Sequence, residues 1–422
     1  MSDLPENWIE VPLPEISIIE MGQSPDSSTY NDQGKGLPFF QGKAEFGKLY
    51  PTVRKWCSQP KKIAEAGDIL LSVRAPVGPT NLALEKCCIG RGLAAIRAKE
   101  HLNQKYLLHY FRNIEPWLTQ QGTGSTFTAI SGGFIRELQI PLAPLNEQKR
   151  IAEKLDSLLA RVDSCQTHLE RVPQILKRFR QSVLAAATSG RLTEDWREDE
   201  KVIEYGEFVF PAAWELSTFD DALTLIDGDR GPNYPKQSDY QESGHCLFLS
   251  TKNVRKFGFE FDDVVFISEE KHKKIRSGTL QYGDVIITTR GTLGNVAFYD
   301  ESVPYKVVRI NSGMLILRKK RDNLLGKYLM ICIGSPLFTS ELEEKRSGSA
   351  QPQIPAKTLK TFALPIPPIE EQAEIVRRVE KLFAYAERLE ARYYSASEHV
   401  ERLTPSLLAK AFRGELVSQG QG

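Results

Sequence analysis

The chain contains one segment twice. Residues 124–190 align with residues 348–414 at a constant offset of 224 positions and without a gap. Within this repeat, the sequence IPLAPLNEQ at 140–148 corresponds to LPIPPIEEQ at 364–372. Upstream of the repeat the two halves differ much more. A chain that keeps its connecting segments and varies what lies between them has the organisation of a modular protein with two variable heads.

Length and composition restrict the class of protein. At 422 residues the chain is too long for one core, so two domains are expected. The 55 basic residues nearly balance the 54 acidic ones, so a surface for nucleic acid would have to be local. No stretch approaches the roughly 20 apolar residues of a membrane helix, and the N-terminus lacks the features of a signal peptide. The six cysteines lack Cys-x-x-Cys spacing. We therefore expect a cytoplasmic protein with reduced thiols, no zinc site and no membrane association.

The repeat predicts four parts. Two variable units cover residues 1–145 and 206–368, and two helical units cover residues 146–205 and 369–422. Both variable units contain short apolar or β-branched runs that are interrupted by Gly, Pro and Asn. This pattern predicts mixed α+β domains with short strands and long loops.

A turn followed by a strand recurs in both variable units. The sequence GDILLSVR at 67–74 corresponds to GDVIITTR at 283–290, at an offset of 216. Gly-Asp is a turn signal, and the apolar run after it predicts a strand. Asp68 and Asp284 could be imagined as catalytic acids, but the pattern favours turn residues that bond their own backbone. A shorter pair of strands is expected at Phe39–Phe40 and Phe248–Leu249, and helices are expected around residues 106–111 and 327–333.

Each helical unit carries an unbroken apolar stripe. From Ile151 to Val183, and again from Ile375 to Leu407, apolar residues recur in alternating steps of four and three, which is a heptad pattern. Two stripes in the same register most simply bury each other as a coiled-coil pair. Because Pro173 and Pro405 lie within the stripes, each helix should kink or restart near its proline. The stripe positions expected to be buried include Ile151, Leu155, Leu158, Val162, Leu169, Leu176, Phe179, Ile375, Val379, Leu382, Leu389, Tyr393, Leu403 and Leu407.

Five segments of the helical units carry a family resemblance: 144–155, 175–181 and 190–196 in the first half, and 371–380 and 408–416 in the second. They resemble the conserved regions of specificity subunits of type I restriction–modification systems, closest to the type IA-like branch. The resemblance covers the whole chain in architecture and is most specific in the helical units. It implies an α+β fold with two mixed α/β target-recognition domains. A pair of long antiparallel coiled-coil helices would separate these domains, in a pseudo-twofold internal repeat.

The resemblance also implies a function. Such a chain would bind double-stranded DNA, recognise a bipartite target with a fixed spacer, and dock two methyltransferase subunits. The complex would methylate adenine with S-adenosylmethionine. With restriction and translocase subunits, it would cleave unmodified DNA using ATP and Mg²⁺. The chain itself would bind no cofactor and no metal and would be non-catalytic. It contains neither the Asn-Pro-Pro-aromatic loop of an amino-methyltransferase nor a P-loop, and its histidines lack metal-ligand spacing.

Candidate DNA contacts are polar side chains in loops that follow strands, where donors can reach phosphates and base edges. A single lysine or arginine is more often a solvated surface charge, so duplication is what favours Arg74 and Arg290. Two polar Gly-Ser loops suit phosphate. The candidates are Lys43, Arg74, Thr123, Ser125 and Thr126 in the first half, and Lys252, Asn253, Arg255, Lys273, Lys274, Arg290, Arg346, Ser347, Ser349 and Gln351 in the second.

Two other functions remain compatible with the sequence. One is a stand-alone sequence-specific DNA binder without an associated methyltransferase. The other is a protein-interaction scaffold whose heads bind peptides or sugars. The duplicated basic residues after strands count against the scaffold. DNA binding that weakens steeply with salt would separate the scaffold from both DNA-binding functions.

Overall fold

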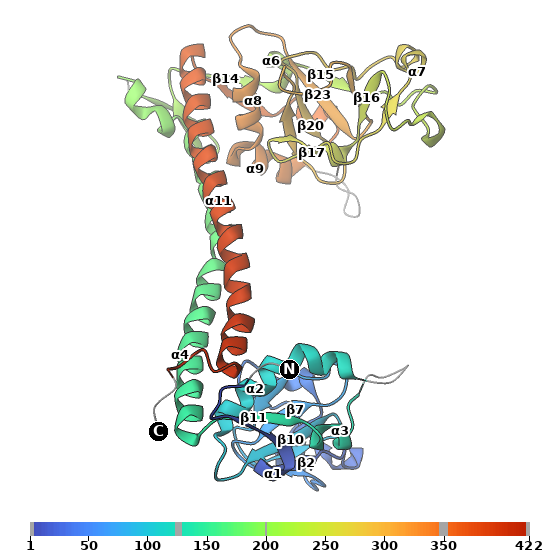
Figure 1. The fold of residues 1–422 in the computed structure, drawn as a ribbon. Helices are drawn as coiled ribbons and strands as arrows, with labels where there is room; N and C mark the ends of the chain where they lie inside the picture. Colours follow the sequence, from blue (N-terminus) through green and yellow to red (C-terminus); the bar gives the residue numbers. More distant parts are fainter. Residues whose placement is uncertain (1–3, 123–128, 199–200, 346–352, 419–422) are drawn as a thin grey trace. The chain divides into compact units, whose positions relative to one another are not determined.

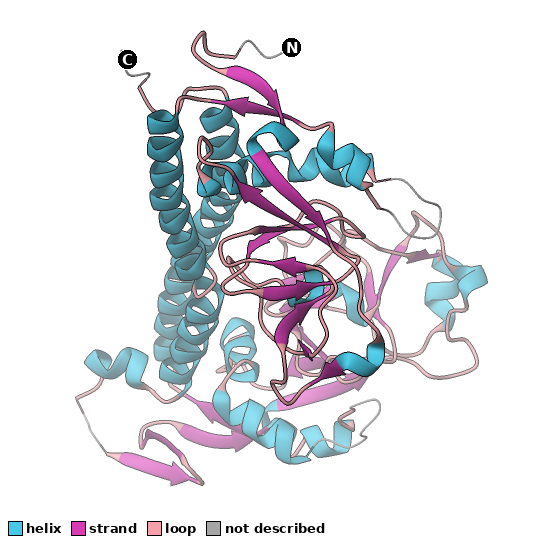
Figure 2. Cartoon of the chain, turned by 90° about the horizontal axis from the view of Figure 1, so that it is seen from below, coloured by secondary structure: helices cyan, strands magenta, loops and turns pink. Residues whose placement is uncertain are grey.

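The computed structural model describes residues 4–122, 129–198, 201–345 and 353–418 (Figure 1). The chain forms two units. Unit 1 consists of residues 1–170 and 394–422, and unit 2 consists of residues 171–393. Each unit therefore contains one variable domain together with parts of the long helices. Short strands joined by long loops make up both variable domains (Figure 2), as the sequence predicts.

Unit 1 is built on a four-stranded antiparallel sheet in the order β2-β10-β7-β8. The strand predicted after the first Gly-Asp turn is confirmed as β7. Its side chains alternate between two apolar layers: Ile69 and Leu71 share a cluster with Tyr106 of the covering helix α2, whereas Leu70 clusters with Ile89 of a second sheet. Burial on both faces explains why this strand is continuously apolar. The second sheet has the order β3-β5-β4-β9-β6.

The elements of unit 1, apart from its share of α11, are β1 (Ile9–Pro12), α1 (Leu13–Ile16), β2 (Ser17–Met21), η1 (Ser27–Thr29), β3 (Tyr30–Asn31), β4 (Leu37–Phe40), η2 (Lys43–Glu45), β5 (Trp56–Cys57), β6 (Ile63–Ala64), β7 (Ile69–Ser72), β8 (Thr80–Leu82), β9 (Cys87–Ile89), β10 (Leu93–Ala98), α2 (Gln104–Gln121), α3 (Gly132–Arg136), β11 (Gln139–Leu142) and α4 (Leu145–Leu169). Strands β1 and β11 pair at the base of the domain, next to the start of α4.

Unit 2 repeats this plan. Its four-stranded sheet has the order β15-β23-β20-β21, and the strand predicted after the second Gly-Asp turn is confirmed as β20. Helix α8 covers one face of this sheet, where Tyr328 clusters with Val285 and Ile287. A second sheet, β19-β16-β22, clusters with the other face through Leu247 and Ile286. The hairpin β12-β13 has no counterpart among the elements of unit 1.

The elements of unit 2 and the last helix are α5 (Val172–Thr188), η3 (Arg191–Trp196), β12 (Val202–Tyr205), β13 (Phe208–Pro211), β14 (Glu215–Thr218), α6 (Phe219–Ala222), β15 (Leu223–Asp227), η4 (Gln237–Asp239), β16 (Cys246–Leu249), η5 (Thr251–Asn253), β17 (Val254–Arg255), β18 (Gly258–Phe259), β19 (Phe266–Ile267), α7 (Glu269–Lys274), β20 (Val285–Thr288), β21 (Val296–Phe298), β22 (Val308–Ile310), β23 (Met314–Lys319), α8 (Gly326–Ile333), α9 (Pro336–Lys345), α10 (Ala356–Leu359), β24 (Ala363–Ile366) and α11 (Ile369–Phe412).

The long helices pack as antiparallel partners within each unit. In unit 1, Ile151 near the start of α4 clusters with Ala411 near the end of α11. In unit 2, Leu184 near the end of α5 clusters with Ile375 near the start of α11. Arg180 of α5 also forms an ion pair of 2.7 Å with Glu390 of α11. The helix pair predicted from the two stripes is therefore present in both units.

The stripe positions differ in burial. Ile151, Leu155, Val162, Leu176, Ile375 and Val379 are buried, and Leu158, Leu169, Phe179, Leu382, Leu389, Tyr393 and Leu407 are half-buried. Leu403 departs from the expectation, because 42% of it is exposed. A straight helix has 3.6 residues per turn, so its buried face drifts by about 20° per heptad. Four heptads after Ile375, this drift has turned Leu403 away from the buried face of the helix, and Leu408 and Ala411 are buried instead.

The two prolines act differently. The first helical unit restarts at its proline, since α4 ends at Leu169 and α5 begins at Val172, with Pro173 in its first turn. A proline in the first turn lacks only an N–H that would have no partner in the helix. The second unit does not restart, because α11 continues through Pro405.

Candidate nucleic-acid interface

At one edge of unit 1, loops from the four-stranded and the five-stranded sheet lie together. Strands β2 and β7 end where the antiparallel strand β10 begins, and the parallel strands β4 and β9 end on this side as well. The loops that follow these strands line a depression of about 250 Å³. Its polar side chains, which we call the basic edge of unit 1, are Ser24, Gln41, Lys43, Arg74 and Arg91. The structure therefore brings together the predicted Lys43 and Arg74.

Unit 2 has the corresponding edge. Strands β15 and β20 end where β23 begins, and the parallel strands β16 and β22 end beside them. A depression of about 400 Å³ is lined there by Arg230 and Arg276, among others. We call the following residues the basic edge of unit 2: Arg230, Lys252, Arg276, Arg290 and Ser312.

At both edges, the backbones of two neighbouring loops approach each other closely. This close approach explains why glycines occur there. A Cβ atom at Gly22, just after β2, would lie 2.1 Å from the carbonyl oxygen of Gly90. A Cβ atom at Gly228, just after β15, would lie 2.1 Å from the carbonyl oxygen of Asn311. Only glycine fits such an approach without displacing the neighbouring loop. The loops that carry the basic side chains are thus fixed by their own backbone.

Arg74 and Arg290 occupy equivalent loops. The hydroxyl of Ser72 donates to the carbonyl oxygen of Pro76 at 2.9 Å, and that of Thr288 donates to the carbonyl oxygen of Thr292 at 2.6 Å, four residues along the chain in both units. Both hydroxyls close the loop that follows the central strand. Among the described residues, no carboxylate forms an ion pair with Lys43, Arg74, Arg91 or Arg290. These cations are therefore available to an anionic ligand.

Asn253 is a correction to the predicted contacts. Only 4% of this residue is exposed, and its side-chain amide donates to the carbonyl oxygens of Glu260 at 3.1 Å and Asp263 at 2.8 Å. Its side-chain oxygen accepts from the backbone N–H of Ser250 at 2.9 Å. A side chain whose hydrogen-bonding groups are engaged inside its own loop holds that loop together and cannot reach DNA.

Two further basic candidates of unit 2 are exposed but have acidic partners. Arg255 pairs with Glu260. Lys252 lies 4.0 Å from Asp263, and both side chains are largely exposed. Exposed pairs of this kind are worth only about 0–1 kcal/mol, so these cations can exchange partners.

Lys273 and Lys274 belong to the short helix α7, where they pair with Glu269 at 2.7 Å and with Glu270 at 2.5 Å. These are ordinary helix pairs one turn apart. The remaining candidates, Thr123, Ser125, Thr126, Arg346, Ser347, Ser349 and Gln351, lie outside the described residues.

The duplicated aspartates are structural. Asp68 accepts the backbone N–H of Glu65 at 2.8 Å and forms a two-bond ion pair with Arg97 at 2.7 and 2.8 Å. Asp284 likewise accepts from the backbone of Gln281 at 2.7 Å and pairs with Arg318. Each carboxylate is buried and bonds its own turn, as the sequence favoured. A turn carboxylate held by an arginine is a poor candidate for acid–base chemistry.

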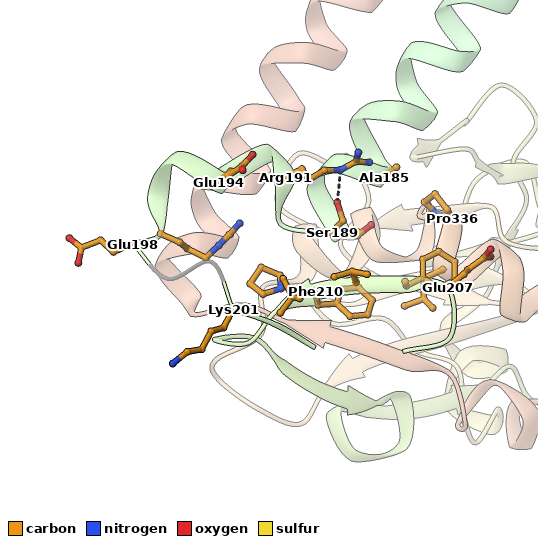
Figure 3. A pocket seen from close by; sticks show the side chains of 16 residues that line it. Ala185, Ser189, Arg191, Glu194, Glu198, Lys201, Glu207, Phe210 and Pro336 are labelled. Atoms are coloured by element: carbon orange, nitrogen blue, oxygen red, sulfur yellow. Dashed lines mark hydrogen bonds between the residues drawn. The ribbon is translucent and has the colours of Figure 1, made fainter. Parts of the chain in front are cut away.

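A larger cavity of about 730 Å³ lies elsewhere in unit 2, between the end of α5, η3, the hairpin β12-β13 and the start of α9 (Figure 3). Its floor is apolar and includes Phe210, whereas Arg191, Glu194 and Glu207 provide charges of both signs. The Arg191 Nε–H donates to the hydroxyl of Ser189 at 3.2 Å. Within the described residues, no group of three or more His, Cys, Asp or Glu side chains could hold a metal ion. In the same residues, no helix is both long and apolar enough to cross a membrane.

The two variable domains also match one family model twice. Residues 5–174 and residues 211–394 each match the type I restriction modification DNA specificity domain. The chain belongs to this family. The matches begin near the first strand of each variable domain and extend into the helical units, in agreement with the repeat.

Relatives of this family align over nearly the whole chain. The type I restriction enzyme EcoKI specificity subunit of Escherichia coli K12 is 30% identical over 438 residues, which covers 99% of this chain and 90% of the relative. The EcoBI specificity subunit of E. coli is 28% identical over 420 residues, with 98% and 87% covered. The recognised family is therefore confirmed, and with it the role of a non-catalytic specificity subunit that recognises a DNA target within a type I restriction–modification complex.

Solved structures share the fold. The HsdS subunit from Thermoanaerobacter tengcongensis superposes with a TM-score of 0.65 at 21% identity and 98% coverage of both chains. A chain from a structural study of complex assembly and conformational transition of the type I R-M system gives a TM-score of 0.73 at 21% identity, covering 98% of this chain and 99% of the other. The predicted α+β fold with two recognition domains and packed long helices is thus confirmed.

The members of the basic edges that sequence analysis did not select include two arginines, Arg91 and Arg230. Both lie in loops whose sequences differ between the halves, so no duplicated residue drew attention to them. The glycines on the same edge could have located both loops, because Gly22 corresponds to Gly228 and Gly92 corresponds to Gly313 once the strands are aligned.

Proposed function

We propose that each basic edge binds one half of a bipartite DNA target with a fixed spacer. The observation that carries this proposal is the duplication of Arg74 and Arg290 at the end of the same strand in two otherwise divergent domains. Arginine combines a fixed positive charge with a fork of donors that suits both phosphates and guanine edges. Loops held by their own backbone present these donors in a fixed geometry.

The framework around the two arginines supports the proposal. The backbone N–H of Val73 donates to the carbonyl oxygen of Gly92 at 2.9 Å, and that of Thr289 donates to the carbonyl oxygen of Gly313 at 2.8 Å. The residue before each arginine is thus tied to the strand that begins at the same edge. Two domains that keep this arrangement while their other loops vary are suited to two half-sites of different sequence.

We further propose that the repeated helical units dock two methyltransferase subunits. Two copies of one sequence offer two equivalent surfaces, and equivalent surfaces bind two copies of one partner. In the complex the methyltransferases would supply S-adenosylmethionine-dependent methylation of adenine. Restriction and translocase subunits would add ATP- and Mg²⁺-dependent cleavage of unmodified DNA. This chain would contribute target recognition and no cofactor.

The test uses the complex of this chain with the methyltransferase subunit that we propose it docks. Arg74→Ala and Arg290→Ala should each weaken binding to target DNA by about 1–2 kcal/mol, measured by fluorescence anisotropy at several salt concentrations. Lys86→Ala and Lys306→Ala are the controls. Lys86 lies one residue before β9 and Lys306 two residues before β22, and since both strands lead toward the basic edges, these lysines lie at the opposite end of the sheets. Unchanged binding by both arginine variants would contradict the proposal.

A further inference from the structure

A serine and an arginine meet at one corner of the basic edge of unit 1. Ser24 lies two residues after Gly22, and Arg91 lies immediately before Gly92. The backbone N–H of Arg91 donates to the hydroxyl of Ser24 at 3.3 Å. Both residues line the same depression as Arg74, and the Arg91 side chain is exposed.

The same corner of unit 2 has the two residue types exchanged. Arg230 lies two residues after Gly228, and Ser312 lies immediately before Gly313. The Arg230 Nη2–H donates to the carbonyl oxygen of Ser312 at 3.4 Å. The corner therefore contains one serine and one arginine in both units, although the arginine comes from different loops.

Strand register, rather than a choice of sequence alignment, makes these positions equivalent. In unit 1, Met21 of β2 pairs with Ala94 of β10. In unit 2, Asp227 of β15 pairs with Leu315 of β23. Counting from these pairs, Ser24 of unit 1 is equivalent to Arg230 of unit 2 in the loop after the first strand of the sheet. Arg91 of unit 1 is equivalent to Ser312 of unit 2 in the loop before the strand that pairs with it.

We propose that Arg91 and Arg230 are equivalent phosphate-binding residues of the two recognition domains. Two half-sites of different sequence have only their sugar–phosphate backbone in common. A charge that is kept at one place while the loop that supplies it changes therefore fits a phosphate, whereas a base-reading residue would follow the sequence of its own half-site. Each exposed guanidinium can bind a phosphate with two parallel N–H groups.

The surroundings of Arg230 suit this role. Its loop is fixed by Asp229, whose carboxylate accepts the backbone N–H of Gly231 at 2.7 Å and that of Arg276 at 2.9 Å. Its own ion pair with Asp227 is 3.4 Å long and half exposed, so a phosphate can replace that carboxylate at little cost. Arg276 opens on the same depression and adds positive charge.

The decisive test moves the arginine between loops. Arg91→Ser should weaken binding of the complex by about threefold to tenfold, equally for target and non-target DNA. It should also reduce the slope of log K against log[salt] by about 0.9, the value for one lost phosphate contact. Adding Ser24→Arg to Arg91→Ser copies the arrangement of unit 2 and should restore both quantities. Arg230→Ser, rescued by Ser312→Arg, is the matched experiment in unit 2.

Arg91→Lys keeps the positive charge and should therefore keep the slope of log K against log[salt]. This variant tests the phosphate contact independently of the double variant. Thermal unfolding should be unchanged in Arg91→Ser, Arg91→Lys and Arg230→Ser, because both arginine side chains are exposed. A double variant as weak as Arg91→Ser, or a loss confined to one base pair of the target, would overturn the inference.

The inference rests on the proposed basic edges, and the two can fail separately. If Arg74→Ala and Arg290→Ala weaken binding while Arg91→Ser and Arg230→Ser do not, only the phosphate assignment is wrong. If none of the four substitutions changes binding, the basic edges themselves are not the DNA-binding surface.

Discussion

Trp8 donates its indole N–H to a carboxylate oxygen of Glu147 at 3.2 Å, and both residues are buried. The bond joins the start of the first variable domain to the first turn of α4. The same bond recurs in unit 2, where Trp214 donates to Glu371 at 3.0 Å. Each recognition domain is therefore attached to its own long helix by a buried, charge-assisted hydrogen bond, which fixes the domain on the helix that follows it.

The carboxylates of Glu147 and Glu371 differ in their other hydrogen-bond and ion-pair partners. Glu147 also accepts from the Asn7 amide at 3.2 Å, whereas Glu371 accepts from the Thr193 hydroxyl at 2.7 Å and pairs with Arg197. Glu147→Gln should therefore lower the free energy of unfolding by about 1–3 kcal/mol. Glu371→Gln should lower it by about 3–5 kcal/mol, because Arg197 loses its partner in a largely buried site. Urea unfolding measures both, with the exposed Glu387→Gln as control. Equal losses would contradict this difference.

The aspartates of the Gly-Asp turns should affect stability and not chemistry. Asp68→Asn and Asp284→Asn each remove a two-bond ion pair with a partly exposed arginine, so each should cost about 2 kcal/mol of unfolding free energy. Methylation by the complex should persist at temperatures well below the lowered midpoint of unfolding. Loss of methylation by a variant that is still folded would instead assign these carboxylates a role in the reaction.

His109 should make the stability of unit 1 depend on pH. Its imidazole is 2% exposed and lies 2.8 Å from Asp156. Burial is the main cause that lowers the pKa of His109 below its ordinary value. The unfolded chain therefore takes up a proton first as pH falls. The stability that the neutral imidazole contributes is present above about pH 6.5 and is lost as pH falls toward the folded-state pKa.

Unit 2 supplies the substitution that tests this dependence. Ile331 occupies the position equivalent to His109, 222 residues later, and is also buried. His109→Ile should flatten the fall in urea midpoint between about pH 7 and about pH 5. The exposed His101→Gln serves as control and should keep the slope of the unsubstituted chain. The same slope in His109→Ile would show that another group titrates.

The close backbone approach at the basic edge predicts that two glycines near this edge differ in how strongly their substitution by alanine affects stability and DNA binding. Gly22→Ala places a Cβ atom 2.1 Å from a carbonyl oxygen, so the loops must move apart. We expect a loss of about 1–3 kcal/mol in unfolding free energy and weaker DNA binding. Gly42→Ala is the matched control, because nothing lies within 4 Å of its added Cβ atom. If both variants bind DNA equally well, the loop geometry around Gly22 is not needed for recognition.

The sequence predicted those features that depend on local periodicity. The heptad stripes predicted a packed pair of helices, whose antiparallel direction was implied only by the family resemblance, and the Gly-Asp turns predicted β7 and β20. Burial along the stripe could not be predicted at Leu403, because it depends on how far the helix pair supercoils. The role of Asn253 was missed because its partners, the carbonyl oxygens of Glu260 and Asp263, become neighbours only when the loop closes.

The basic edges could be predicted only in part. Arg74 and Arg290 were found because their strand is duplicated at a constant offset. Arg91 and Arg230 were not found, since they lie in different loops and become equivalent only through the strand pairing of the folded domains. A sequence repeat shows only those residues that both domains have in the same loop. A charge that both domains place at the same position, but from different loops, can be recognised only in the folded structure.

The central claim is that each recognition domain reads its own half of a split target. The most direct measurement is long-read methylation sequencing of DNA from cells that express this chain with the methyltransferase subunit proposed to bind it. A second strain would carry residues 1–145 replaced by the corresponding domain of a relative. The account predicts a split motif with one methylated adenine in each half, of which the replacement changes one half and leaves the other intact. A change in both halves, or an undivided motif, would contradict it.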